Sequence, residues 1–123
     1  MNITAVSKKF NLSTYALRYY ERIGVLPNVT RNKSGIRDYS EADCRWVEFI
    51  KCMRGAGLPI EILIAYVPLF QQGDATKEAR KELLVEQRDK LVNRIIEMQK
   101  AVDRLNGKIE RLNQPIVTKK QDL

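Results

Sequence analysis

The chain has 123 residues, of which 44% are hydrophobic and 30% charged, a composition typical of a folded globular protein. It contains no histidine, the commonest general base and the commonest metal ligand. No apolar run approaches the ~20 residues that cross a membrane, and the first ten residues lack the pattern of a signal peptide. We therefore expect a cytoplasmic protein with no membrane contact, no cofactor and no metal site.

The net charge of +7 is unevenly distributed along the chain. Residues 1–57 contain ten Lys or Arg and five Asp or Glu, whereas residues 58–123 contain twelve and ten. The N-terminal half is therefore the half to which a polyanion such as nucleic acid would bind. A solvated basic face that binds nothing is the alternative.

Two short helices are predicted at the N-terminus. Apolar residues recur at helical spacing over residues 3–10, and Ser13 can cap a second helix that runs to about Arg22, where Gly24 ends it. Two short helices joined by a turn of three or four residues form a helix-turn-helix.

The next segment, residues 27–39, contains isolated β-branched residues around a turn cluster that ends at Gly35. This pattern predicts a small β-ribbon, or wing, with a basic tip. Ser40, followed three residues later by Asp43, approximates a capping box for a third helix over about 41–54.

A fourth, nearly all-apolar helix is predicted over residues 59–70. Pro59 suits the first helical position, and Pro68 should end or kink the helix. A segment this apolar must pack against something.

A long helix is predicted over residues 76–113, because apolar residues repeat there with a seven-residue period. The two apolar positions of the repeat are filled by Leu84, Leu91, Ile95, Met98, Val102, Leu105, Ile109 and Leu112. Such a helix would be ~55 Å long. The pattern favours a two-chain coiled coil; the alternative is a long helix packed along its own domain, which the remaining residues are too few to cover.

Three stretches of the chain resemble the MerR family of bacterial transcription regulators. They are TYALRYYERIGVL (14–26), RNKSGIRDYSEAD (31–43) and FIKCMRGAGLPIEI (49–62), which follow one another at family spacing. The resemblance implies a mainly α protein with a winged helix-turn-helix DNA-binding domain over 1–72. It further implies a dimerising helix that forms an antiparallel coiled coil over 73–114, followed by a flexible tail over 115–123.

The resemblance also implies a function. Regulators of this type act as homodimers on a near-palindromic promoter operator, and their coiled coil sets the distance between the two winged domains. On effector binding they bend and untwist the DNA, which realigns the promoter elements for RNA polymerase. The physical basis is the sequence-dependent cost of deforming the duplex.

Candidate DNA contacts lie on the second helix, the wing and the end of the third helix. On a helical wheel, Arg18 faces away from Leu17 and can bond guanine or phosphate. Tyr19 and Tyr20 can donate to phosphates, or they are core rings. The wing charges could instead be solvated loop charges that bind nothing. Tyr39 could instead be a structural ring. The full set is Ser13, Thr14, Tyr15, Arg18, Tyr19, Tyr20, Arg31, Lys33, Gly35, Arg37, Tyr39, Lys51 and Arg54.

Two cysteines, Cys44 and Cys52, fall eight residues apart in the third helix, ~12 Å along its axis, and cannot form a disulfide within one chain. The cations Lys51 and Arg54 would favour the thiolate of Cys52. The position of Cys52 resembles the MerR subgroup that responds to aldehydes, other electrophiles or nitrosative stress. A packing role is the alternative, and Cys44 is interpreted as packing.

The sequence leaves other functions open. An effector could instead be a small hydrophobic molecule held beside Tyr66 and Phe70. A MerR-like repressor or architectural protein and a coiled-coil adaptor also fit parts of the sequence, although an adaptor leaves the basic wing unexplained. An enzyme is not expected, because the chain has no histidine, phosphate-binding loop or nucleophile motif.

Overall fold

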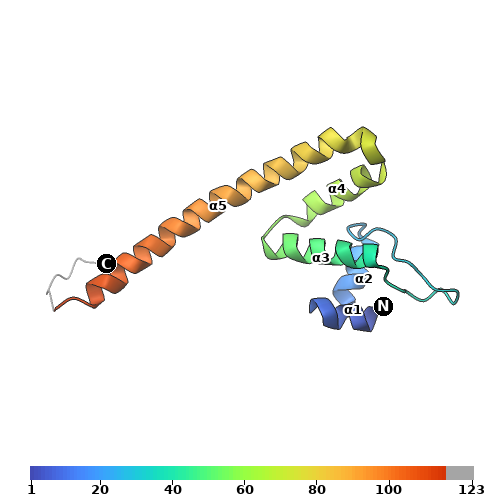
Figure 1. Cartoon of the computed structure of the whole chain (residues 1–123), viewed down its shortest axis with the longest axis horizontal. Coiled ribbons are helices and arrows are strands. Elements are labelled where there is room, and N and C mark those ends of the chain that lie inside the picture. The colour runs from blue at the N-terminus through green and yellow to red at the C-terminus, as the bar shows by residue number, and fades with distance from the viewer. Residues whose placement is uncertain (116–123) are drawn as a thin grey trace. The chain divides into compact units, whose positions relative to one another are not determined.

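The computed structural model describes residues 1–115, so the tail predicted over 115–123 lies outside these residues except for its first residue, Pro115. The chain divides into two compact units, Met1–Val85 and a second that begins at Glu86. Five α-helices and one 3-10 turn make up the regular structure of the described residues (Figure 1). The prediction of a mainly α protein is therefore confirmed.

The predicted helix-turn-helix is present as α1 (Ile3–Phe10) and α2 (Thr14–Arg22). Asn11 ends α1 in the left-handed conformation with φ of 53°, which asparagine tolerates. The Ser13 hydroxyl oxygen accepts a hydrogen bond of 3.0 Å from the Ala16 N–H and so caps α2.

The wing that follows α2 has less β structure than the ribbon predicted from the sequence. Its two arms form one isolated antiparallel bridge, between Arg31 and Arg37. At the tip, the Asn32 side-chain oxygen accepts hydrogen bonds of 2.9 and 3.1 Å from the N–H groups of Ser34 and Ile36. Because Asn32 supplies these bonds, the turn closes without a longer strand ladder.

Helix α3 (Glu41–Gly55) begins with the predicted capping box. The Asp43 carboxylate accepts hydrogen bonds of 2.9 Å from the Ser40 N–H and 3.1 Å from the Thr30 N–H, so it also holds the wing to α3. Burial alone would raise the pKa of Asp43, but these hydrogen bonds outweigh it and hold the pKa below its usual value.

Helix α4 (Ile60–Gln71) corrects two details of the prediction. Pro59 is the N-cap and not the first helical residue, and the helix continues past Pro68 to Gln71. Proline removes one backbone donor, which leaves the carbonyl of Ile64 without its helical partner. Pro68 and Ile64 both lie on the exposed side of α4, where water can satisfy that carbonyl.

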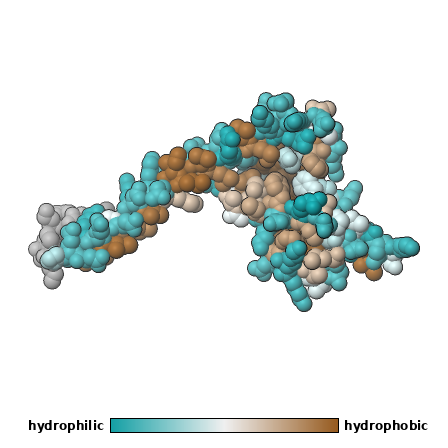
Figure 2. Space-filling model, in the orientation of Figure 1, coloured by the Kyte–Doolittle hydropathy of each residue, from teal (hydrophilic) through white to brown (hydrophobic). Residues whose placement is uncertain are grey.

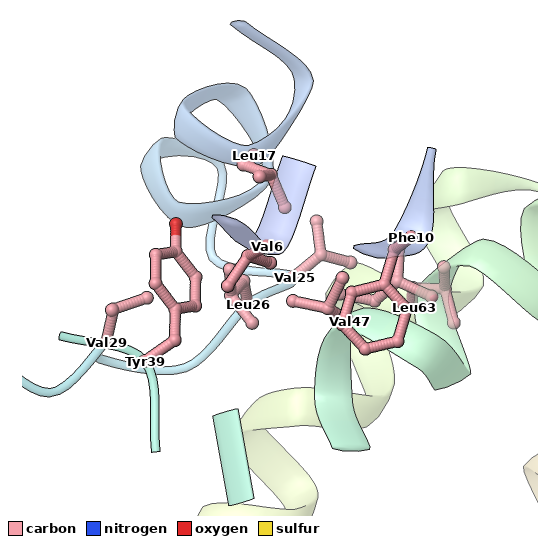
Figure 3. Packing of buried hydrophobic residues seen from close by; sticks show 10 residues of the cluster. Val6, Phe10, Leu17, Val25, Leu26, Val29, Tyr39, Val47 and Leu63 are labelled. Atoms are coloured by element: carbon pink, nitrogen blue, oxygen red, sulfur yellow. The ribbon is translucent and has the colours of Figure 1, made fainter. Parts of the chain in front are cut away.

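The core of the first unit is built from α1, α2, the start of the wing, α3 and α4 (Figure 3). Its buried side chains are Val6, Phe10, Leu17, Val25, Leu26, Val29, Tyr39, Val47, Ile50 and Leu63. This core fixes α2 and both ends of the wing, the elements that carry most of the predicted DNA contacts.

Helix α5 (Lys77–Leu112) differs from the predicted long helix by one residue at each end. Its apolar side chains are largely exposed, and Figure 2 shows brown side chains at intervals along the helix. Leu91 is half-buried. The other residues of the predicted seam are exposed, namely Leu84, Ile95, Met98, Val102, Leu105, Ile109 and Leu112.

Candidate nucleic-acid interface

Helix α2 turns one face to the core and the opposite face to solvent. Leu17 is fully buried, whereas Tyr15 is 71% exposed and Arg18 is exposed. The hydroxyl of Ser13 caps the helix, and Thr14 is half-buried. The face that carries Tyr15 and Arg18 is therefore free to enter a groove or contact phosphates.

The two tyrosines singled out in the sequence lie at the border between this face and the core. Tyr19 and Tyr20 are half-buried, and their ring centroids are 6.0 Å apart. Tyr20 packs against the core, as the alternative interpretation expected. The Arg22 guanidinium lies 5.3 Å from the centroid of the Tyr19 ring, a cation–π contact that orients the ring at the edge of the surface.

The wing is joined to α2 by ion pairs at Glu21. An Arg37 nitrogen lies 2.8 Å from one carboxylate oxygen of Glu21, and an Arg31 nitrogen lies 3.5 Å from the other. Lys33 is exposed at the tip, and Gly35 has a φ of 78° that favours glycine there. Glu21 thus brings the predicted wing residues Arg31 and Arg37 to the end of α2, the helix that carries Arg18.

Tyr39 does not belong to the exposed surface. Its side chain is 3% exposed, and Figure 3 shows its hydroxyl directed toward α2. Burial raises the pKa of Tyr39 and the Glu21 carboxylate raises it further, although Arg37 and Arg18 oppose the shift. The predicted DNA contact is therefore corrected: Tyr39 fills the space under α2 and anchors the base of the wing.

Lys51, Cys52 and Arg54 are exposed on the last turns of α3, away from the wing in the chain. An Arg54 nitrogen donates a hydrogen bond of 2.6 Å to the carbonyl oxygen of Leu58, so part of its guanidinium is already engaged. Cys52 is exposed, so it does not serve as a buried packing residue within the first unit. Cys44, by contrast, packs against the core, in line with its interpretation as a packing residue.

The described residues 1–115 contain no group of three His, Cys, Asp or Glu side chains arranged to hold a metal ion. Over the same residues, the structure has no helix that is both long and apolar enough to span a membrane.

Sequence reasoning missed two residues that shape this surface, Glu21 and Asn32. Glu21 lies in the last turn of α2, where the helix dipole disfavours an acid, and this unfavourable position could have indicated a specific cationic partner. Asn32 stands before Lys33-Ser34-Gly35, a context in which asparagine commonly bonds the backbone two residues later.

Two family models match the chain. The first, described as MerR HTH family regulatory protein, matches residues 1–67, and the second, described as MerR, DNA binding, matches residues 44–113. The chain is 58% identical over 92 residues to the HTH-type transcriptional regulator AdhR of Bacillus subtilis. That match covers 75% of this chain and 66% of AdhR, so the chain matches about two thirds of that relative's length.

Solved structures agree with these matches. A MerR family protein from Listeria monocytogenes is 49% identical, with a TM-score of 0.89 over 93% of this chain and 86% of that chain. HiNmlR, a MerR family regulator lacking the sensor domain and bound to promoter DNA, is 28% identical, with a TM-score of 0.82 over 89% and 86%. These relatives are transcriptional regulators and not enzymes. The chain is a DNA-binding transcriptional regulator and belongs to the MerR family.

Proposed function

We propose that this regulator acts as a homodimer on a near-palindromic promoter operator and distorts the DNA between its two halves. The observation that carries the proposal is the apolar seam of α5, whose residues recur every three or four positions from Leu91 to Leu112. All residues of the seam except the half-buried Leu91 stand exposed in the single chain. A seam of this kind is buried when two helices form a coiled coil. An antiparallel pair would then hold two winged units at a set distance.

Promoter DNA is the proposed ligand of the surface formed by α2 and the wing. Arg18 and Tyr15 project from α2, and Lys33 projects from the wing tip. This division suits a helix that reads base edges and a wing that contacts the backbone or minor groove. HiNmlR, which has been crystallised on promoter DNA and shares 28% identity with this chain, supports the assignment.

Distortion of the operator can be tested directly. A DNA fragment carrying the operator is labelled with a fluorophore at each end, and energy transfer is measured with and without the protein. We expect shortening of the end-to-end distance on the operator and no change on a shuffled sequence. Transcription by RNA polymerase from promoters with normal and lengthened spacers then separates an activator, which needs the longer spacer, from a repressor or architectural protein.

Cys52 is the proposed sensor of electrophiles or nitrosative stress. It is exposed on α3, where reagents can reach the thiol, and lies in sequence between the cations Lys51 and Arg54. Adding a small aldehyde or a nitric oxide donor should raise the intact mass at Cys52 and change transcription. Cys52→Ser should abolish both effects, and Cys44→Ser is the matched control. An unmodified Cys52 would contradict the proposal.

A non-covalent hydrophobic effector is the second candidate, because the first unit contains an aromatic cavity of about 310 Å³. Its lining includes Trp46, Phe49, Tyr66 and Phe70, and the rings of Trp46 and Phe70 are 5.0 Å apart. This volume is at the lower end of small-molecule sites. Trp46 is the one tryptophan of the chain, so a bound ligand should quench its fluorescence. Tyr66→Ala should weaken the quenching.

A further inference from the structure

The acidic residue at the end of α2 has no role in the function described so far. Glu21 lies one turn after Arg18, in a basic half of the chain that is proposed to bind a polyanion. A carboxylate at this place opposes both the helix dipole and the phosphates of DNA. Such a residue is disfavoured unless a specific partner compensates for it.

The compensation comes from the two arms of the wing. Each arm contacts a different carboxylate oxygen of Glu21. Arg37 Nη2 lies 2.8 Å from Oε2, and Arg31 Nη2 lies 3.5 Å from Oε1. Arg37 Nε also donates to Oε2 at 2.8 Å, which makes that pair two-pronged. The Glu21 side chain is only 18% exposed, so solvent screens these pairs less than pairs on an open surface.

Both arginines keep donors for a second partner. A guanidinium has five N–H donors, and Glu21 takes only part of them from each side chain. Arg31 places Nη1 against the Gly35 carbonyl oxygen at 3.0 Å, which fixes its orientation across the wing. The carboxylate therefore orients two cations without exhausting them.

A buried ring lies below this cluster. The Tyr39 hydroxyl points toward α2, and the charges of Glu21, Arg37 and Arg18 all act on its pKa. The ring is buried in the core between the base of the wing and α2. One backbone bridge, Arg31 to Arg37, is the only β pairing in this segment of the described residues. Backbone hydrogen bonds close the tip, from the Gly35 N–H to the Asn32 carbonyl oxygen, and hold the base, from the Tyr39 N–H to the Met1 carbonyl oxygen. The Glu21 ion pairs add the link from the arms of the wing to α2.

We propose that Glu21 is the positioning residue of the DNA-binding surface: it clamps Arg31 and Arg37 to the end of α2, so that helix and wing contact the operator in one register. This inference rests on the proposed binding of promoter DNA. The clamp has a second effect, since the carboxylate offsets one positive charge at the surface. Binding to arbitrary phosphates is thereby weakened while binding to the matching site is favoured.

The first variant is Glu21→Gln, which removes the charge and keeps the size of the side chain. Glu48→Gln is its matched control, because Glu48 is an exposed acid of the same unit on α3 and its removal changes the net charge equally. Dissociation constants are measured on the operator and on shuffled DNA over a range of salt concentrations. Circular dichroism confirms that each variant is folded.

We expect Glu21→Gln to lower the ratio of operator affinity to shuffled-DNA affinity about tenfold, with tighter binding to shuffled DNA and a salt slope steeper by about 0.9. Glu48→Gln should leave the ratio within about twofold of the wild type. A Glu21→Gln ratio within that range, or an equal fall for Glu48→Gln, would overturn the proposal.

A third variant separates charge from position. Glu21→Asp keeps the charge but is one methylene too short to meet both arms. It should retain the wild-type salt slope and still lose part of the specificity ratio. Full wild-type specificity in Glu21→Asp would show that charge alone matters and would overturn the positioning role.

The failure of DNA binding itself would be recognised separately. If the wild type binds operator and shuffled DNA equally, the proposed function fails, and the clamp is then judged on the free protein. The backbone ¹⁵N–¹H NOE of residues 32–36 should fall in Glu21→Gln and stay unchanged in Glu48→Gln. An unchanged NOE in Glu21→Gln would reject the clamp irrespective of DNA.

Discussion

The two units of the chain differ in where their apolar side chains go. In Met1–Val85, the α3 residues Val47 and Ile50 are each 1% exposed. In the unit that begins at Glu86, the α5 residues Ile95 and Met98 are each 64% exposed. Both helices have a regular apolar pattern. The first unit therefore buries its pattern within one chain, whereas the second displays a pattern that a partner helix would bury.

The size of this difference follows from the hydrophobic effect. Complete burial of one aliphatic side chain contributes roughly 1.5–3 kcal/mol. Seven residues of the α5 seam are exposed, and association also costs rotational and translational freedom. Burial of the seam would oppose that cost, which makes the oligomeric state the first property to test.

The largest expected effect comes from placing charges in the seam. Leu91→Asp with Leu105→Asp should raise the dissociation constant of the dimer at least about 1,000-fold, because both carboxylates would be buried between helices. Sedimentation velocity gives the mass. Asn93→Asp with Gly107→Asp adds the same charge outside the seam and should remain dimeric. A dimer that survives the seam changes would show that α5 is buried in another way.

The second effect tests the core of the first unit. Leu17→Ala should lower the free energy of unfolding by about 2–5 kcal/mol, since it leaves a cavity under α2. Urea denaturation in the monomeric Leu91→Asp, Leu105→Asp background makes this loss independent of association. Ile36→Ala, at an exposed wing position, should change stability by less than about 0.5 kcal/mol. Equal losses at the two sites would contradict the contrast between core and surface.

The third effect tests whether the first unit recognises the DNA bases independently of the dimer seam. Arg18→Ala should remove about 1–3 kcal/mol of discrimination between operator and shuffled DNA and leave the dimer mass unchanged. Competition binding measures the discrimination. Arg45→Ala, an exposed cation on α3, is the control. The same loss on both DNA sequences would rule out a base-reading role for Arg18.

The fourth effect is a pH dependence in the first unit. The pKa of Asp43 is lowered in the folded protein, so its stabilising effect is complete above the unfolded-state pKa and is lost as pH falls through the folded value, below 3.8. At neutral pH, Asp43→Asn should cost about 1–2 kcal/mol. Denaturation curves at a series of pH values should show the two proteins converging in acid. A constant difference would contradict the assignment.

The smallest effect is expected at the wing tip. Lys33→Ala should weaken binding to operator and shuffled DNA alike and should reduce the salt slope by about 0.9, the value for one phosphate contact. Binding titrations at several salt concentrations give the slope. A loss confined to the operator would mean that the tip reads sequence.

Much of the fold could be predicted from local patterns. Ser13, the Ser40 and Asp43 pair, and the seven-residue repeat of α5 each act through hydrogen bonds or spacing within one helix, and the structure agrees with them. Pro68 is the exception, because it was expected to end or kink α4, whereas the helix continues to Gln71 with the proline on its exposed side.

The candidate site was only partly predictable. Arg18 and Tyr15 are exposed as the helical wheel indicates, since the periodicity of one helix decides which side faces the core. For Tyr39 the structural alternative is correct and the DNA contact is not, because its burial depends on α2, which lies 17 or more residues away in the chain. The position of Glu21 in the last turn of α2 indicated a cationic partner, but nothing in the sequence identified Arg31 and Arg37 as that partner.

By itself, the sequence determined the helices, the N-caps of α2 and α3, the basic N-terminal half and the apolar seam of α5. These features arise from contacts between residues a few positions apart, which composition and spacing reveal. Only the tertiary structure decided that Glu21 joins the wing to α2 and that Tyr39 supports them from below. Those contacts join residues that lie 10 to 16 positions from Glu21 or on different elements, so they exist only after the core has brought the elements together.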